Sequence, residues 1–375
     1  MKRRIGVFLL ATLFIVPACK KTEKPGAGVA SLSSDSAAVY VAGGLFVQDP
    51  VTGKQILYAI CWKNGVPTAL ATNYRSFGTC VALEGNDVYV GGSTSTATTF
   101  DQATYWKNGH PVTMTDGSTN AQVYGLAING QDVYAAGFTT DNSGFPVATC
   151  WKNGVAITLA PGGFYSVANG IAISGNDVYV VGEFMNGHLD SATVIVWKNG
   201  VTQAFTDYPF SYATSVVAAG NDLYVGGTST SGNGWSNAAT IWKDDLLDWE
   251  VVYPTLTQVN SFALSGNDIY AAGNLTIPGG APAAAWWKNG TVLPLSGAVD
   301  SSFASGIAIN GRDIYIAGGT VDYSYQNNNQ AFCWKNGVPF TLKNSVVAPV
   351  KNGTDSTGLY AYGIAVRSNQ DVTAP

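Results

Sequence analysis

The sequence repeats itself with a period of about 45 residues, which restricts the chain to folds that stack one small unit many times. A Trp-Lys pair occurs seven times, at successive spacings of 44, 45, 46, 45, 45 and 47 residues. The tryptophans are Trp62, Trp106, Trp151, Trp197, Trp242, Trp287 and Trp334, and six of the seven pairs continue as Asn-Gly. A second motif, Asp-(Val/Ile/Leu)-Tyr, keeps the same phase and begins at Asp87, Asp132, Asp177, Asp222, Asp268 and Asp313.

Each repeat contains four strand-like segments, as in residues 170–173, 178–181, 149–151 and 155–159. The Asn-Gly pairs suit two-residue type I′ hairpins, because both residues accept a positive φ. Four antiparallel strands repeated every 40 to 50 residues describe a propeller blade. The sequence therefore predicts an all-β fold, a seven-bladed β-propeller of four-stranded antiparallel blades. Two β-sandwiches are the alternative, but they would not repeat with a single period.

The ends of the repeat region predict how the ring closes. The first clear strand, at Val39-Tyr40, is of the second type in its blade, and the last, Gly363 to Val366, is of the innermost type. We therefore expect the C-terminal strand to complete the first blade, which removes the exposed edges of an open ring. Residues 29–32 are a competing candidate for that place.

The N-terminus has the features of a targeting segment. Three basic residues at positions 2–4 precede an apolar run from Ile5 to Val16, too short to span a membrane and typical of a signal peptide. The Cys19 that follows Val16-Pro17-Ala18 resembles the lipobox of bacterial lipoproteins, which implies lipidation of Cys19. We expect residues 1–18 to be the signal peptide, 19–36 the anchor and tether, and 37–375 a single propeller domain.

The repeat also resembles two known families. Residues 88–92, Val-Tyr-Val-Gly-Gly, with a Trp later in the blade, are similar to kelch repeats. Residues 330–337, Gln-Ala-Phe-Cys-Trp-Lys-Asn-Gly, resemble the bacterial extracellular repeats called HAF. The resemblance spans residues 37–367 and implies a fold and an extracellular compartment, not an activity. The expected location is the outer membrane or cell surface, or the medium if Cys19 is not lipidated.

Charge and motifs exclude several functions. The net charge is −5, or −8 without the basic residues at positions 2–4, which disfavours nucleic acid as a partner. The sequence contains no nucleotide, hydrolase or zinc motif, and we predict no cofactor and no metal. The innermost strands present small residues at Cys80, Gly125, Gly170, Ser215, Ser261, Gly306 and Gly363. An axial active site would therefore need acids and bases from elsewhere, namely the loops.

The repeated residues are interpreted as scaffold. We expect the tryptophans to pack between blades, and the repeated Lys and Asp to pair along one face of the ring. Cys61, Cys150 and Cys333 occupy an apolar position before the repeated Trp and are expected to be free, buried thiols.

Function is expected on the opposite face, where the connections vary in length and composition. Aromatic side chains among amides and hydroxyls suit sugar rings or a protein partner. The predicted ligand-binding residues are Phe100, Phe145, Tyr208, Trp235, Tyr323 and Tyr325. The sequence therefore predicts an envelope lipoprotein that binds a glycan or a surface protein and touches the membrane only through its lipid.

Two alternatives remain open. One is a glycan-processing hydrolase or lyase that uses loop carboxylates, for which the segment Glu183 to Asp190, with His188 between its carboxylates, is the best candidate. The other is a structural surface protein without a small-molecule site. We expect no catalytic residues, but the sequence alone does not decide between these functions.

Overall fold

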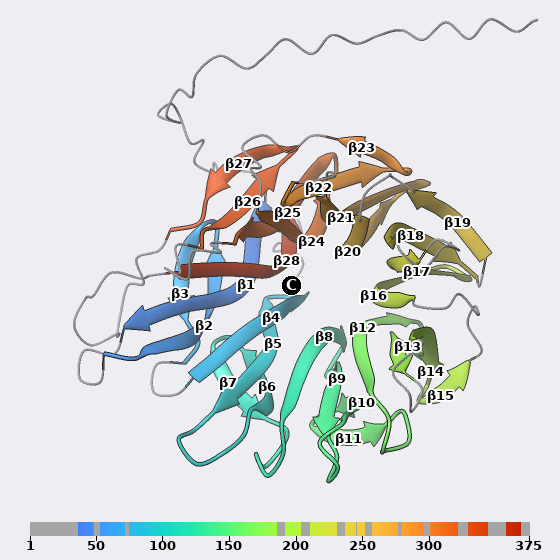
Figure 1. Cartoon of the computed structure of the whole chain (residues 1–375). Helices are drawn as coiled ribbons and strands as arrows, with labels where there is room; N and C mark the ends of the chain where they lie inside the picture. Colours follow the sequence, from blue (N-terminus) through green and yellow to red (C-terminus); the bar gives the residue numbers. More distant parts are fainter. Residues whose placement is uncertain are drawn as a thin grey trace, which may run out of the picture.

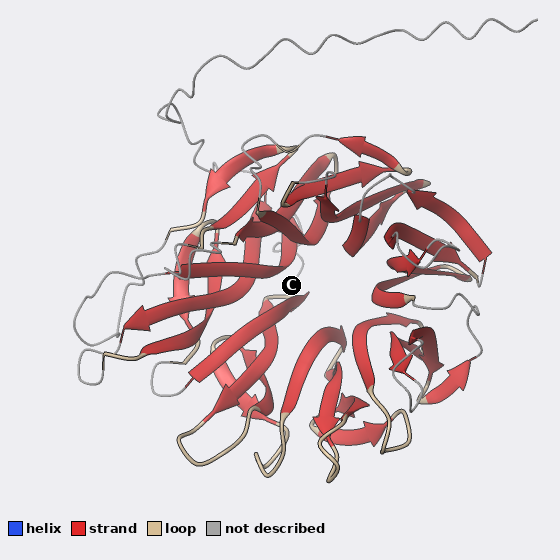
Figure 2. Cartoon of the chain, viewed as in Figure 1, coloured by secondary structure: helices blue, strands red, loops and turns tan. Residues whose placement is uncertain are grey.

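The chain forms a ring of seven four-stranded antiparallel sheets (Figure 1). This computed structural model describes residues 37–48, 53–71, 75–185, 192–203, 211–230, 237–244, 246–251, 257–276, 280–293, 295, 301–321, 329–343 and 358–368. These residues form strands and their connections, without a helix (Figure 2). The predicted all-β, seven-bladed propeller is confirmed.

We number the blades from the one that contains the first strand. Blade 1 consists of β28 (Gly358–Ser368), β1 (Ala37–Gln48), β2 (Gln55–Lys63) and β3 (Val66–Ala69). Blade 2 consists of β4 (Arg75–Glu84), β5 (Asp87–Ser95), β6 (Gln102–Lys107) and β7 (His110–Thr113). Blade 3 consists of β8 (Ala121–Asn129), β9 (Asp132–Thr140), β10 (Pro146–Lys152) and β11 (Val155–Thr158). Blade 4 consists of β12 (Ser166–Ser174), β13 (Asp177–Met185), β14 (Ala192–Lys198) and β15 (Val201–Gln203).

The remaining blades follow the same order. Blade 5 consists of β16 (Tyr212–Ala219), β17 (Asp222–Thr230), β18 (Asn237–Lys243) and β19 (Leu246–Val251). Blade 6 consists of β20 (Thr257–Ser265), β21 (Asp268–Thr276), β22 (Pro282–Lys288) and β23 (Thr291–Leu293). Blade 7 consists of β24 (Ser302–Asn310), β25 (Asp313–Thr320), β26 (Ala331–Lys335) and β27 (Val338–Thr341).

The ring has two different faces. The antiparallel pairing places the turn between the first and second strands on the same side as the Asn-Gly turn, and we call this side the turn face. In blade 3 the Asn-Gly turn has φ 51° at Asn153 and 82° at Gly154, as a type I′ hairpin requires. The connections between second and third strands and between blades lie on the opposite side, which we call the loop face.

The repeated tryptophans hold neighbouring blades together. All seven are buried, with at most 1% of each side chain exposed. Trp197 of blade 4, for example, packs against Ala148 and Cys150 of blade 3. In six of the seven blades the residue before the Trp shares a core cluster with the Trp of the next blade, as Cys333 does with Trp62, whereas Tyr105 packs with Tyr89 and Val133. Both predictions, inter-blade packing and an apolar position for these cysteines, are confirmed.

Blade 1 closes the ring by joining the two ends of the described chain. β28 pairs with β1 from Ala37↔Ser368 to Phe46↔Gly358, and Figure 1 shows the two strands side by side at the centre. The predicted closure by the C-terminal strand is confirmed. Residues 29–32, the competing candidate, lie outside the described residues.

The cysteines of the described structure, Cys61, Cys80, Cys150 and Cys333, are free thiols, as predicted for three of them. Cys150 and Cys333 are buried as expected, whereas Cys61 is partly exposed. Burial raises the pKa of Cys61, Cys80 and Cys150 to about 12. A thiolate is the reactive form, so these groups stay protonated and inert at pH 8. We expect dithiobis(nitrobenzoate) to react slowly with the folded protein and fully once guanidinium unfolds it. Rapid reaction of the folded protein would contradict this packing.

Candidate functional site

A cavity of about 220 Å³ lies on the axis of the ring and is lined by the first strand of every blade. The seven small residues predicted for the inner strands all line it. They are needed because the strands crowd together there. A Cβ on Gly363 would lie 2.6 Å from the Cα of Cys80 in the next blade.

A β-bulge in each first strand directs a second ring of residues into this cavity. The pairing register slips by one residue at Thr79, Tyr124, Asn169, Thr214, Asn260, Ser305 and Tyr362. Bulges commonly re-aim a side chain next to a functional site. All seven of these residues line the axial cavity.

Five of the bulge residues connect neighbouring blades. Their hydroxyl or amide groups donate to a backbone carbonyl of the next blade at 2.6–2.9 Å, from Thr79, Asn169, Thr214, Asn260 and Ser305. Tyr124 and Tyr362 make no such bond within the described structure. At these two blades the bulge residue is a tyrosine, so the ring of small polar side chains is interrupted by aromatic ones.

A second hollow, of about 430 Å³, adjoins the axial cavity on the loop face. The two share Asn260, Ser305 and Tyr362. The hollow lies near the starts of β24 and β28 and the end of β21, and is also lined by Asn274, Pro282, Ser301, Ser302, Phe303, Val321 and Tyr360. Its walls therefore combine aromatic rings with amide and hydroxyl groups.

The aromatic wall of this hollow is fixed by ring contacts. Tyr360 and Tyr362 stack with 6.1 Å between ring centres and 24° between planes. Phe303 lies 5.9 Å from Tyr362 and Phe77 meets the same ring edge-on at 4.9 Å. Asn329 donates a hydrogen bond to the Tyr360 hydroxyl. Burial raises the pKa of Tyr362 to about 12, so its hydroxyl remains a neutral donor and acceptor.

A half-buried carboxylate lies among tyrosines on the other side of the ring. Glu183, near the end of β13, accepts a hydrogen bond from Tyr165, while burial raises its pKa. Burial and then the Glu183 charge raise the pKa values of Tyr165, Tyr124 and Tyr212, and Tyr165 reaches about 12. Tyr124 also lines the axial cavity, so this charge adjoins a cavity whose own lining carries no acid.

Glu183 corrects one sequence expectation. The segment from Glu183 to Asp190 was interpreted as a loop, whereas Glu183, Phe184 and Met185 belong to β13. The second strands run further than expected because their outer ends still pair with the third strands, as in Phe184↔Thr193. His188 and Asp190 lie outside the described residues. A carboxylate therefore approaches the axis from a strand, not from a loop.

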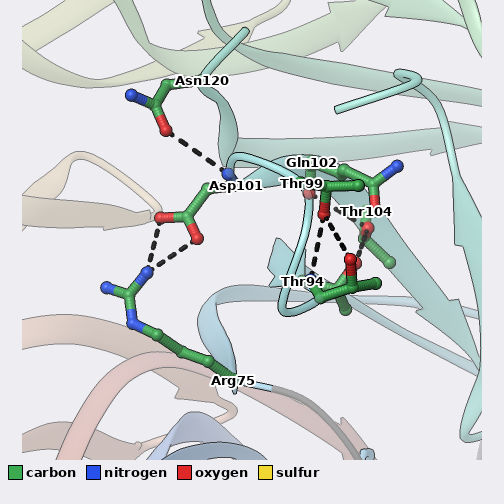
Figure 3. A network of polar contacts seen from close by, with 8 residues as sticks. Arg75, Thr94, Thr99, Asp101, Gln102, Thr104 and Asn120 are labelled. Carbon is green, nitrogen blue, oxygen red and sulfur yellow. Dashed lines mark hydrogen bonds and ion pairs between the residues drawn. The ribbon is translucent and has the colours of Figure 1, made fainter. Parts of the chain in front are cut away.

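Two of the predicted ligand residues are described, and both are exposed on the loop face. Phe100 is 56% exposed and Phe145 is 37% exposed, and neither lines the two cavities. The Phe100 loop is held by an ion pair between Arg75 and Asp101 at 2.7 Å (Figure 3). The Phe145 loop is held by the Asp141 carboxylate, which accepts backbone N–H groups and so has a lowered pKa. Both rings are thus on fixed loops, at a different place from the hollow.

The other predicted residues, Tyr208, Trp235, Tyr323, Tyr325 and the lipidation site Cys19, lie outside the described residues. Their roles stay predictions. No three His, Cys, Asp or Glu residues of the described part come together as a metal site. Over the same residues, no helix has the length and apolar character needed to cross a membrane.

The lining of the hollow was missed from the sequence, although the repeat contained a pattern that locates part of it. Counting back seven residues from each repeated Asp finds the small inner residues. Counting back eight finds the bulge residues of blades 2 to 7, which are Thr, Tyr, Asn, Thr, Asn and Ser. A polar or aromatic residue beside a small one in every repeat is the pattern that predicts a bulge facing the axis. Nothing in the repeat singles out Tyr360.

Comparisons with known proteins support the fold alone. No protein-family model matches the chain, and no curated protein is detectably similar to it in sequence. The β-propeller domain of the Trilobed protease from Pyrococcus furiosus matches with a TM-score of 0.55 and 11% identity, over 84% of this chain and 99% of that chain. The acylaminoacyl peptidase of Pyrococcus horikoshii matches with a TM-score of 0.53 and 12% identity, over 82% of this chain and 52% of that chain.

The chain thus spans about half the length of the acylaminoacyl peptidase. The trilobed protease domain is described as having an open velcro topology, whereas β28 and β1 close the ring here. These similar structures come from peptidases, and the kelch, HAF and lipoprotein resemblances have no matching model, so they stay predictions. What is established is a seven-bladed propeller, a fold that carries binding surfaces in many unrelated proteins.

Proposed function

We propose that this chain is a binding module of the cell envelope, anchored through a lipid on Cys19, that holds a glycan in the loop-face hollow. The observation that supports this proposal is the composition of the hollow. Phe303, Tyr360 and Tyr362 form its aromatic wall, and Asn260 and Asn274 are its amides. Sugar rings present apolar faces and hydroxyl edges, and this wall offers partners for both. A volume of about 430 Å³ lies within the usual range for small-ligand sites.

The aromatic wall gives the first test. Tyr360→Ala removes one stacked ring, and we expect glycan affinity to fall about tenfold or more, because buried aromatic anchors dominate most binding sites. Tyr360→Phe keeps the ring and should retain most of the affinity. The wild-type protein is screened on a glycan array, and the glycan it selects is then titrated into both variants by calorimetry.

Two further variants locate the ligand. Val155 is 70% exposed and follows the Asn-Gly turn of blade 3 on the turn face, so Val155→Ala should leave binding unchanged. Phe100→Ala tests the rim predicted from the sequence. Loss of affinity in Phe100→Ala with none in Tyr360→Ala would place the ligand on the outer loops and reject the hollow. Absence of binding to any glycan would favour a protein partner or a structural role.

The lipid anchor has a separate test, based on thiol counting. The chain contains five cysteines, and the four described ones are free thiols. A lipidated Cys19 carries a thioether and cannot react as a thiol. The membrane-associated protein, unfolded in guanidinium, should therefore titrate four thiols, and the mass of its N-terminal peptide should include the acyl groups. A fifth thiol would show that Cys19 is unmodified.

Glycan hydrolysis is the second candidate, and Glu183 is the observation that favours it. A half-buried carboxyl with a raised pKa is the kind of group that acts as a general acid. Hydrolysis by the usual mechanism requires a second carboxylate. The expected result is that the bound glycan is recovered intact after prolonged incubation. Cleavage that disappears in Glu183→Gln would replace the binding role by catalysis.

A further inference from the structure

The turn face carries six copies of one polar cluster, and comparison of the copies shows which side chains the cluster contains. In each copy the repeated Lys approaches the repeated Asp, with Nζ–Oδ2 distances of 2.7–2.8 Å. The same Nζ lies 5.1–5.4 Å from the centre of the repeated Tyr ring. The predicted pairing of Lys and Asp on one face is thereby confirmed.

The repeated Asn completes the cluster. In blade 3 the Asn153 Oδ1 accepts the backbone N–H of Val133 at 2.8 Å, and its Nδ2 donates to Asp132 Oδ1 at 2.8 Å. Blades 2, 4, 6 and 7 repeat both bonds, whereas blade 5 has Asp244 in place of the Asn. One carboxylate therefore accepts hydrogen bonds from a lysine and an amide. In blade 3 the bonds from Lys152 and then Asn153 lower the pKa of Asp132.

Blade 1 keeps the donors and lacks the acid. Ala38 stands where the other blades have Asp. Asn64 is oriented as in the other blades, since its Oδ1 accepts the N–H of Val39 at 2.8 Å. Lys63 Nζ again lies over the repeated ring, 5.6 Å from the centre of Tyr40. Among the described residues, neither Lys63 nor the Asn64 amide has a carboxylate partner.

A second cation stands beside this vacant position. The Arg367 guanidinium of β28 lies 5.4 Å from the centre of the Tyr40 ring. The guanidinium donates to the backbone carbonyls of Asn86 and Asp87 at 3.3 and 2.9 Å, and these bonds hold it in place. Because carbonyls are neutral, these bonds do not neutralise the charge of Arg367. Blade 1 thus gathers two cations around one tyrosine, in a chain whose net charge is −5.

We propose that the turn face of blade 1 is an oxyanion-binding site, in which a ligand carboxylate or phosphate takes the place of the missing Asp. Lys63 Nζ and Asn64 Nδ2 would bind its oxygens, as their equivalents bind Asp in the other blades, and Arg367 adds attraction at short range. The buried Tyr40 ring, only 5% exposed, orients both cations. Such a group is found on free organic acids and phosphates and on anionic lipid headgroups.

Titration of the intact protein with sodium acetate or inorganic phosphate, at constant ionic strength, tests the site. We expect saturable ¹⁵N shifts at the Asn64 side-chain amide and the Val39 backbone amide. The equivalent groups at Asn153 and Val133 serve as an internal control, because Asp132 already fills their cluster. Equal shifts at both blades would indicate a general salt effect and overturn the proposal.

Substitutions sharpen this test. Ala38→Asp supplies the missing acid, so it should weaken anion binding about tenfold while slightly raising the unfolding midpoint, which shows that the variant is folded. Lys63→Met should weaken binding to a similar degree. Lys152→Met, which removes the matching lysine of blade 3, should leave the blade 1 response intact. Unchanged binding in Ala38→Asp would overturn the site.

Two further arms identify the source of the anion. If a lipid headgroup is the ligand, the wild type should bind vesicles of phosphatidylglycerol but not of phosphatidylcholine. The Ala38→Asp variant should then not bind phosphatidylglycerol vesicles. A response to acetate or phosphate without vesicle binding assigns a free anion. Asp35 lies three residues before Ala38 in the sequence. If the wild type responds to nothing and only Asp35→Asn binds anions, the chain's own acid fills the position and the proposed ligand site is rejected.

Discussion

Gly137→Ala should destabilise the propeller by about 4 kcal/mol or more, an unusually large effect for the addition of one methyl group. A Cβ at Gly137 would lie 1.9 Å from the backbone oxygen of Gln122. That oxygen belongs to the strand that bulges at Tyr124, so it moves only if the bulge and its pairing open. The glycine has an equivalent in every blade, with the same clash at 1.8–2.0 Å. The change is measured as a fall in the denaturant midpoint at constant m-value.

The same sheet offers a matched control. Gly125 of β8 also faces the crowded axis, but a Cβ there would meet the Ile171 side chain at 3.1 Å, a tight contact that a shift of a few tenths of an ångström in that side chain relieves. Blades 2, 5 and 6 already carry Cys80, Ser215 and Ser261 at the equivalent position. Gly125→Ala should therefore cost much less than Gly137→Ala. Equal costs would mean that crowding at the axis, and not the bulge, decides the requirement for glycine.

Features that recur in six or all seven repeats could be predicted from the sequence. The Trp and the residue before it serve packing, the Asn-Gly hairpins serve turning, and the Lys-Asp pairs serve charge balance. Six or seven copies of each motif, all in phase, therefore specified the architecture. Even the small inner residues followed, because the strands converge on one axis in every blade.

Features of single blades could not be predicted in this way. The hollow depends on Phe303 of β24 and Tyr360 of β28, which lie two residues before the bulge in neighbouring inner strands, at a position held by Gln122 in blade 3 and Val167 in blade 4. Glu183 is likewise one carboxylate at a repeat position held in blade 6 by Asn274. Its neighbours come from three blades, so its environment appears only in three dimensions. Blade 1 is the opposite case, in which a repeated residue is missing. Its lack of an Asp indicates an anion site only by comparison with the complete Lys-Asp clusters of the other six blades.

Truncation of the chain before Gly358 should destabilise the protein more than Gly137→Ala does, because it removes β28 and leaves the ring open. The strand supplies β1 with pairs from Ala37 to Phe46 and the axial cavity with Tyr362, Gly363 and Ile364. Its loss also exposes Trp62 and its neighbours, which share one core cluster with Leu359 and Ile364. We expect a protein that aggregates through the unpaired edge of β1 and shows no cooperative unfolding transition.

Truncation after Ser368 is the matched control, since it removes the C-terminal residues and keeps β28 whole. That variant should unfold with the wild-type midpoint. Co-expression of residues 358–368 as a separate peptide should partly restore cooperative folding to the chain truncated before Gly358. The reason is that β28 contributes through pairing and packing and not through chain continuity. Restoration would also distinguish β28 from residues 29–32, the other segment able to close the ring. If the truncated chain folds cooperatively without the peptide but fails when residues 29–32 are also deleted, the N-terminal segment replaces β28, and closure is a competition between the two ends of the chain.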